Sequence, residues 1–223
     1  GAPARGAAAR GTQAARDVIG ANLPHRHSGP RASVGGAVLD APATLQLGYA
    51  LALLRSGDAA RNEEAAENLR SAASAGLATA QYMLGVMNEQ GQGMPQNREA
   101  ATELYRQAAQ KGLRSAQARY GFALLHGLGV AHSLQEGESW LRRAALQGDP
   151  DSAALVGDMY SRGGELPPNH SESAMWYARA AAAGHKGAAR SLGLQFLTGA
   201  GVPKDAREAA RWFRRAAEAG EEK

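Results

Sequence analysis

Small and aromatic apolar residues return along the chain at one constant step. Three near-copies of a nine-residue string are WLRRAALQG at 140–148, WYARAAAAG at 176–184 and WFRRAAEAG at 212–220. The Ala-Ala-x-x-Gly core of the string occurs five times, with its first alanine at Ala72, Ala108, Ala144, Ala180 and Ala216. A fixed period of about 20 to 50 residues is typical of repeat proteins, whose units are too small to bury their apolar faces alone.

Two further sets of positions keep the same 36-residue register. One is always glycine, at Gly85, Gly121, Gly157 and Gly193. The other holds a large apolar residue, at Leu69, Tyr105, Leu141, Tyr177 and Phe213. Together with the small residues around them, these positions predict a unit of two helices. In the unit that starts at residue 80, helix A is expected over about 80–90 and helix B over about 98–111, with a glycine loop between them.

The ends of helix B and the glycine within helix A carry specific expectations. Helix B should begin after an N-cap side chain, at Asn97, Ser133, Asn169 and Asp205. It should end at the glycine of the Ala-Ala-x-x-Gly core, which favours a left-handed C-cap. The glycine within helix A costs about 1 kcal/mol relative to alanine, so we expect the backbones of the two helices to approach closely there.

Residues 80–112, AQYMLGVMNEQGQGMPQNREAATELYRQAAQKG, resemble the Sel1-like repeat, an antiparallel helix pair of the tetratricopeptide-like superfamily. The residues that carry the resemblance are Ala80, Leu84, Gly85, Gly91, Gly93, Asn97, Ala100 or Ala101, Tyr105, Ala108, Ala109 and Gly112. The resemblance covers four units closely and residues 44–79 more loosely. It implies an all-α fold, an α/α solenoid of about five antiparallel helix pairs with this 36-residue period.

We expect two parts in the chain. Residues 1–43 are rich in Ala, Gly, Arg and Pro, hold five arginines and two aspartates, and should be a flexible basic segment. Residues 44–223 should form the solenoid, with a degenerate first repeat at 44–79 followed by units 80–115, 116–151, 152–187 and 188–223.

Charge and composition argue against several classes of function. The formal net charge of +4 falls mainly on the first segment, so the repeats lack the clustered basic face that is typical of nucleic-acid binders. The absence of cysteine excludes disulfides and thiol catalysis. No stretch approaches the roughly 18 apolar residues of a membrane-spanning helix.

Candidate catalytic and metal-binding residues each have a simpler structural interpretation. His25 and His27 lie in the flexible segment without a further ligand, so we expect no metal and no cofactor. Glu136, Glu138 and Glu172 fall near the start of helix B, where a carboxylate favours the helix dipole. The tryptophans should be core, and a recurrent arginine position of helix B should form a solvated face, at Arg70, Arg106, Arg142 and Arg214. We therefore predict no catalytic residues and no enzyme.

The functional surface is expected on helix A. In tetratricopeptide-like arrays helix A lines the concave face, so the resemblance implies a groove there. Its non-repeating positions mix apolar and charged side chains, and they are Tyr82, Met83, Val86, Arg119, Phe122, His126, Leu155, Asp158, Arg162, Arg190 and Leu194. The alternative is that some of the apolar members only fill the contacts between neighbouring A helices.

These features predict a non-catalytic scaffold that binds a protein or peptide partner in the helix-A groove, with no nucleic-acid partner. The alternative is a regulatory or targeting fragment of a larger multidomain bacterial protein, related to the cell envelope, polarity or secretion. We expect weak self-association through the last repeat, which has no further helix to cover Trp212 and Phe213. The resemblance favours a periplasmic or exported location over a cytoplasmic one.

Overall fold

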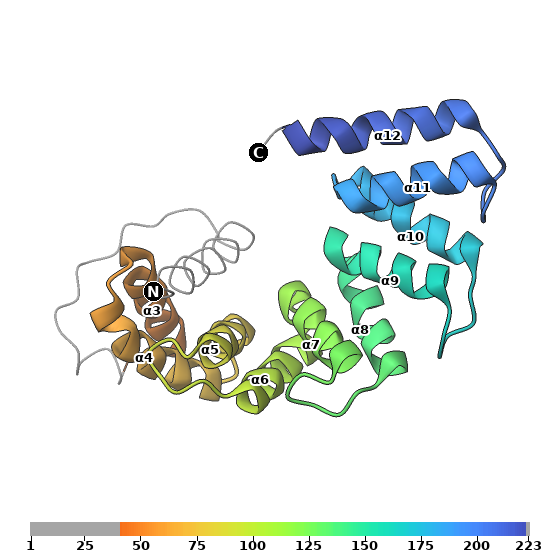
Figure 1. Ribbon diagram of the computed structural model, residues 1–223. Coiled ribbons are helices and arrows are strands. Elements are labelled where there is room, and N and C mark those ends of the chain that lie inside the picture. Colours follow the sequence, from red (N-terminus) through yellow and green to blue (C-terminus); the bar gives the residue numbers. More distant parts are fainter. Residues whose placement is uncertain (1–40, 222–223) are drawn as a thin grey trace, which may run out of the picture. The chain divides into compact units, whose positions relative to one another are not determined.

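The computed structural model describes residues 41–221, and this part of the chain is helical with no strand (Figure 1). Most of the predicted flexible segment 1–43 lies outside the described residues. The first helices are α3 (Ala43–Ser56), α4 (Asn62–Ser74), α5 (Ala78–Gln90) and α6 (Arg98–Gln110), with a 3-10 turn at Ala59–Arg61. They are followed by α7 (Arg114–His126), α8 (Leu134–Leu146), α9 (Pro150–Arg162), α10 (His170–Ala182), α11 (Lys186–Thr198) and α12 (Ala206–Glu221).

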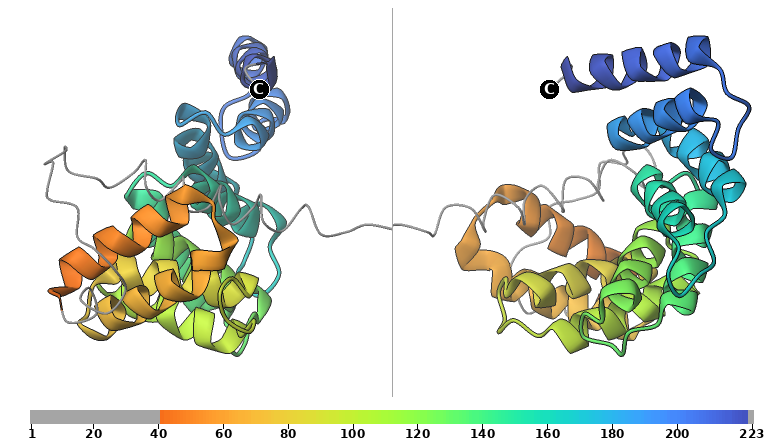
Figure 2. Two further views of the ribbon diagram at one scale, coloured as in Figure 1. Left: turned by 90° about the vertical axis from the view of Figure 1, so that its left-hand side faces the viewer. Right: turned by 45° about the vertical axis from the view of Figure 1, so that its right-hand side comes forward.

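The chain divides into two compact units. The described part of unit 1 runs to Ala116 and includes Leu128–Val130, and unit 2 holds Gln117–Gly127 and the chain from Ala131 onward. In unit 1, α3 packs on α4, α4 on α5 and α5 on α6. In unit 2 each helix from α8 to α12 packs on the next one, and α9 also touches α11 (Figure 2). The predicted all-α fold is confirmed.

The predicted N-caps of helix B are confirmed. The side-chain oxygen of Asn97 accepts a hydrogen bond from the backbone N–H of Ala100 at 3.0 Å, at the start of α6. The equivalent bond, to the backbone N–H three residues on, is made at the starts of α8, α10 and α12 by Ser133, Asn169 and Asp205. Each of these bonds satisfies one of the N–H groups that a helix start leaves without an acceptor.

The Ala-Ala-x-x-Gly core closes helix B through its backbone. After α6, the N–H of Gly112 donates to the carbonyl of Ala109 at 2.9 Å, and the N–H of Leu113 donates to the carbonyl of Ala108 at 3.2 Å. This pair of bonds is a Schellman motif, which requires the left-handed backbone found at Gly112, with φ of 88°. The same pair follows α4, α8 and α10. At the fifth copy the expected C-cap is wrong, because α12 continues through Gly220 to Glu221.

The glycine within helix A marks the closest approach of the two helices. A Cβ atom at Gly121 in α7 would lie 2.9 Å from both Cγ and the backbone nitrogen of Leu141 in α8. At the same repeat position, a Cβ on Gly157 would lie 2.6 Å from the ring of Tyr177. These distances are too short for any side chain. The expected close approach is confirmed, and the large apolar residue of helix B lies directly on the bare backbone of helix A.

Replacement of Gly121 by leucine should therefore destabilise the protein. We expect Gly121→Leu to lower the free energy of unfolding by about 1 to 3 kcal/mol, because the added side chain has to push α8 away from α7. Chemical denaturation followed by circular dichroism measures this change.

The control is Gly48→Leu in α3, another helical glycine, whose Cβ would have no atom within 4 Å. This variant should be neutral or stabilising, because leucine favours a helix more than glycine does. A Gly121→Leu protein as stable as the parent would show that the glycine is not required by packing.

Candidate functional site

Three of the predicted groove residues are buried in unit 1. Met83 and Val86 of α5 are 1% and 2% exposed, and Tyr82 is 5% exposed. The Tyr82 ring lies 5.6 Å from the Tyr105 ring of α6, so Tyr82 belongs to the contact between helices A and B. This differs from the expectation of an exposed groove floor at these positions, because α5 is buried along every residue from Ala80 to Met87.

In unit 2 the predicted positions are at least partly exposed. We call them the helix-A surface of unit 2, which consists of Arg119, Phe122, His126, Leu155, Asp158, Arg162, Arg190 and Leu194. Phe122 of α7 and Leu194 of α11 occupy the same repeat position and are 41% and 49% exposed. The ring of Phe122 lies 4.3 Å from that of His126, one helical turn on. Large apolar side chains thus reach the surface from two different A helices.

The one carboxylate of this surface is already engaged. The hydroxyl of Tyr177 in α10 donates to Asp158 Oδ1 at 2.5 Å. Burial and this hydrogen bond raise the pKa of Tyr177 to about 12, so the tyrosine stays protonated at neutral pH. Arg162 and Arg190 are exposed on the same surface. The helix-A surface of unit 2 therefore includes both exposed apolar groups and positive charge.

Sequence reasoning missed one exposed residue near this surface. Leu197 of α11 is 45% exposed, one turn after Leu194, yet it was not among the predicted positions. The same repeat position holds Glu89, Leu125 and Ser161 in the other units. This mixture of polar and apolar residues is the feature of the sequence that could have indicated an exposed position.

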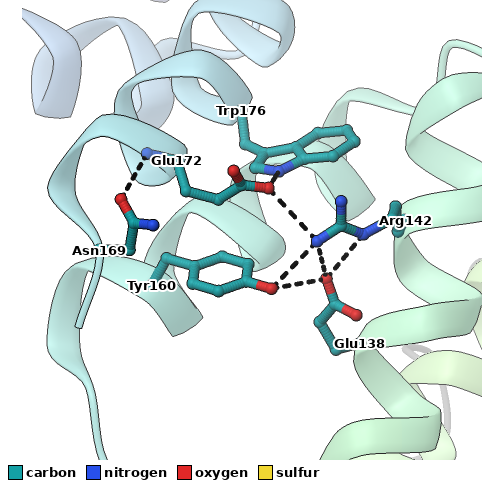
Figure 3. A network of polar contacts seen from close by, with 6 residues as sticks. All are labelled: Glu138, Arg142, Tyr160, Asn169, Glu172 and Trp176. Carbon is teal, nitrogen blue, oxygen red and sulfur yellow. Dashed lines mark hydrogen bonds and ion pairs between the residues drawn. The ribbon is translucent and has the colours of Figure 1, made fainter. Parts of the chain in front are cut away.

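A second cluster of polar side chains joins helices α8, α9 and α10 (Figure 3). Glu138 Oε1 accepts two hydrogen bonds from the guanidinium of Arg142, at 2.6 and 2.8 Å. The same guanidinium donates to the Tyr160 hydroxyl at 3.0 Å and lies 3.3 Å from Glu172 Oε1. Glu172 also accepts a hydrogen bond from the indole of Trp176 at 3.1 Å. The arginine thus connects three consecutive helices.

The surroundings raise the pKa of two members of this cluster, Arg142 and Tyr160. Burial alone would lower the pKa of Arg142, but the hydrogen bond and the charge of Glu138 raise it above its usual value. Burial and the neighbouring Glu138 carboxylate raise the pKa of Tyr160. The Arg142 guanidinium and the Tyr160 hydroxyl both serve as hydrogen-bond donors to Glu138.

Two expectations need correction here. Arg142 is not part of a solvated face, because its guanidinium binds two carboxylates and lies 5.3 Å from the centre of the Trp176 ring. Glu138 and Glu172 likewise do more than interact with the helix dipole, because both contact the Arg142 guanidinium. Of the tryptophans, Trp176 is core as expected, with 2% of its surface exposed, whereas the other two are half-buried. Each of the three lies beneath an arginine from the next helical turn, Arg143, Arg179 or Arg215.

The described residues offer no metal site, because they contain no group of three or more His, Asp or Glu side chains placed to hold an ion. None of the helices between residues 41 and 221 is long and apolar enough to cross a membrane. The histidine pair considered as a ligand, His25 and His27, lies outside the described residues.

Helix pairs with this spacing, these caps and this glycine contact define a class of helical-repeat proteins. The model of the Sel1 repeat matches residues 78–113, 114–149, 150–185 and 187–221. The chain belongs to the Sel1 repeat family. Residues 44–79, expected to be a degenerate first repeat, largely precede these matches and contain α4 and most of α3.

Two solved structures are similar over most of the chain. One is a protective antigen present in uropathogenic Escherichia coli strains, displaying an SLR fold, with 30% identity and a TM-score of 0.77 over 80% of this chain. The chain spans only 38% of that antigen. The other is a Sel1 repeat protein from Oxalobacter formigenes, with 28% identity, a TM-score of 0.75, and coverage of 80% of this chain and 74% of that one. No curated protein matches the chain in sequence.

These similarities confirm the predicted α/α solenoid fold. Sel1 repeat proteins generally mediate protein–protein interactions, and the fold is typically a non-catalytic scaffold.

The Arg142 cluster predicts a loss of stability on charge reversal. Arg142→Glu places a third carboxylate beside Glu138 and Glu172 and should lower the free energy of unfolding by about 1 to 2 kcal/mol. This value lies between those of exposed and buried ion pairs, because 36% of the Arg142 side chain is exposed. Urea denaturation measures it.

Arg214→Glu is the matched control, since Arg214 has the same repeat position in α12 and is exposed. It should change the free energy of unfolding by less than about 0.5 kcal/mol. Equal effects of the two substitutions would mean that the cluster does not stabilise unit 2.

Proposed function

We propose that the chain is a non-catalytic scaffold that binds a partner protein or peptide on the helix-A surface of unit 2. The observation that carries the proposal is the exposure of Phe122 and Leu194, two large apolar side chains at one repeat position. A solvated helix face is normally polar, so two large apolar side chains exposed at one repeat position support an interaction role for this surface.

The charges of this surface indicate what kind of partner fits. Arg162 and Arg190 are exposed, whereas the Asp158 carboxylate is occupied by Tyr177. A partner that supplies apolar anchors together with acidic groups satisfies both features, as helix-lined grooves commonly do with peptides. Met83 and Val86 are left out of the proposed surface, since both are buried.

The test starts from proteins captured from the source organism with the parent chain, whose affinities are then measured with variants. Phe122→Ala should weaken binding about tenfold or more, because an aromatic anchor commonly contributes 2 kcal/mol or more at an interface. Arg190→Glu should weaken binding and reduce its salt dependence. The melting temperature should stay nearly unchanged in both, since both side chains are exposed.

Leu146→Ala is the matched control, because Leu146 is 57% exposed but lies on the helix-B side, in α8. It should leave the affinity unchanged. If Phe122→Ala lowers the melting temperature strongly, Phe122 is a packing residue. If both helix-A variants bind as tightly as the parent, the partner uses another surface.

The second candidate function is that of a regulatory or targeting part of a larger bacterial protein. The observation that favours it is that the similar Escherichia coli antigen is much longer, so that the chain spans 38% of its length. The complete reading frame around this sequence distinguishes the two. A catalytic or membrane-anchoring domain in the same polypeptide would favour the second candidate.

Self-association through the last helix pair remains a prediction. Trp212 and Phe213 of α12 are only partly exposed, because Phe213 lies on Gly193 of α11 and Arg215 lies 5.1 Å above the Trp212 ring. If the edge of α12 does associate, sedimentation should detect dimers that disappear when a polar helix is fused after Lys223.

A further inference from the structure

A small apolar cavity opens at the surface of unit 2 between helices α10, α11 and α12. Its volume is about 320 Å³, and its walls include Met175, Ala178, Phe196, Val202, Glu208 and Trp212. Met175, at the rim, is 52% exposed. The volume lies at the lower end of the range of about 300 to 1,000 Å³ for small-molecule sites, which suits a single side chain better than a cofactor.

The preceding repeat has a side chain in the equivalent place. Trp176 and Glu172 are equivalent to Trp212 and Glu208, one repeat earlier. There the space over the tryptophan is filled by the Arg142 guanidinium, which Glu138 and Tyr160 hold in place (Figure 3). The three residues that fill and hold that space are replaced, one repeat later, by Ala178, Ala174 and Phe196. Loss of the arginine side chain leaves the cavity open.

An arginine from a partner does not suit the open cavity. The carboxylate that binds Arg142 most closely, Glu138, has become Ala174, and the hydroxyl of Tyr160 is absent from Phe196. Glu208, the remaining carboxylate, is paired with Arg211 at 2.7 Å. A cation in this cavity would lose its water without gaining a free counter-charge, which is costly.

The charges next to two of the wall residues instead favour an acidic neighbour. Arg215 lies 5.1 Å from the Trp212 ring, and no carboxylate among the described residues pairs with it. Arg211 is 70% exposed beyond its contact with Glu208. Two arginines therefore adjoin the wall residues Trp212 and Glu208, and the walls themselves are mainly apolar.

We propose that this cavity is a docking site for an acidic protein segment, which inserts one bulky apolar side chain between Met175, Phe196 and Trp212. The carboxylates beside that side chain pair with Arg215 and Arg211. An aromatic anchor fits best, because it stacks against the rings of Trp212 and Phe196. This α10–α12 site is formed by different residues from the helix-A surface of unit 2 and does not depend on that proposal.

The three tryptophans allow a direct test in the full chain. Each indole N–H gives its own signal in a ¹H–¹⁵N correlation spectrum, and Trp212→Phe assigns the relevant one. The probe is the acetylated, amidated peptide GDEFEDG. We expect it to shift the Trp212 signal in a saturable manner, with a Kd below about 1 mM, while the signals of Trp140 and Trp176 stay in place.

Peptide variants test the chemistry of the occupant. The peptide GDEAEDG, which lacks the anchor, and GKKFKKG, which reverses the flanking charge, should each bind about tenfold more weakly or worse. The peptide GDEREDG presents an arginine instead. If GDEREDG or GKKFKKG binds as tightly as GDEFEDG, the proposed occupant is wrong.

Protein variants test the location. Ala178→Arg fills the cavity with the residue of the preceding repeat, and Met175→Glu changes its exposed rim; each should weaken binding about tenfold. Leu146→Glu is the control for Met175→Glu, since Leu146 is 57% exposed on α8 and does not line the cavity. Arg215→Glu should weaken binding, whereas Arg143→Glu, at the same repeat position over Trp140, should not.

The spectrum itself shows whether each variant is folded. If Ala178→Arg does not fold, the comparison of Met175→Glu with Leu146→Glu tests the location, because Met175 is exposed. An unshifted Trp212 signal at 5 mM GDEFEDG, about five times the largest expected Kd, would overturn the proposal. Equal losses with Met175→Glu and Leu146→Glu would overturn it as well.

Discussion

The contact between a bare glycine in helix A and a large side chain of helix B determines how each of the four helix pairs from α5 to α12 is built. Leu141 and Tyr177 lie on the backbone of Gly121 and Gly157 at distances that leave no room for a Cβ. The contact also sets the reach of the tyrosine hydroxyls, so that Tyr105 donates to Glu89 in unit 1 and Tyr177 donates to Asp158 in unit 2. The glycine is unfavourable within a helix, but it allows the close contact on which both the packing and these hydrogen bonds depend.

The features that repeat could be predicted because each depends on residues close together in the sequence. An N-cap needs a short polar side chain and the N–H group three residues on, and a Schellman motif needs a glycine two residues after the helix end. Both were read correctly at Asn97 and Gly112. Gly220 was not, because the same local string lies within the continuous helix α12.

The features that do not repeat were the difficult ones. Arg142 and Arg214 share one repeat position, yet only Arg142 is held by Glu138, Tyr160 and Glu172 from three helices. Val86 and Leu194 also share a position, and the first is buried while the second is 49% exposed. Periodicity describes the average unit and contains no information on such neighbours. The helix-A surface of unit 2 consists of positions that vary between units, whereas the α10–α12 site combines the recurring Trp212 with neighbours that differ from those of the preceding unit.

The turn from each helix B to the next helix A has a consequence for how such a chain changes over generations. After both α6 and α8 the turn is held by the same two backbone hydrogen bonds around one left-handed glycine, Gly112 or Gly148. If genetic recombination joins the helix B of one unit to the helix A of another, the new turn can form the same two backbone hydrogen bonds as the old one. A whole 36-residue unit is thus gained or lost without a new connection having to evolve. The number of repeats can then change between generations, and selection acts on the surface residues that each added unit contributes.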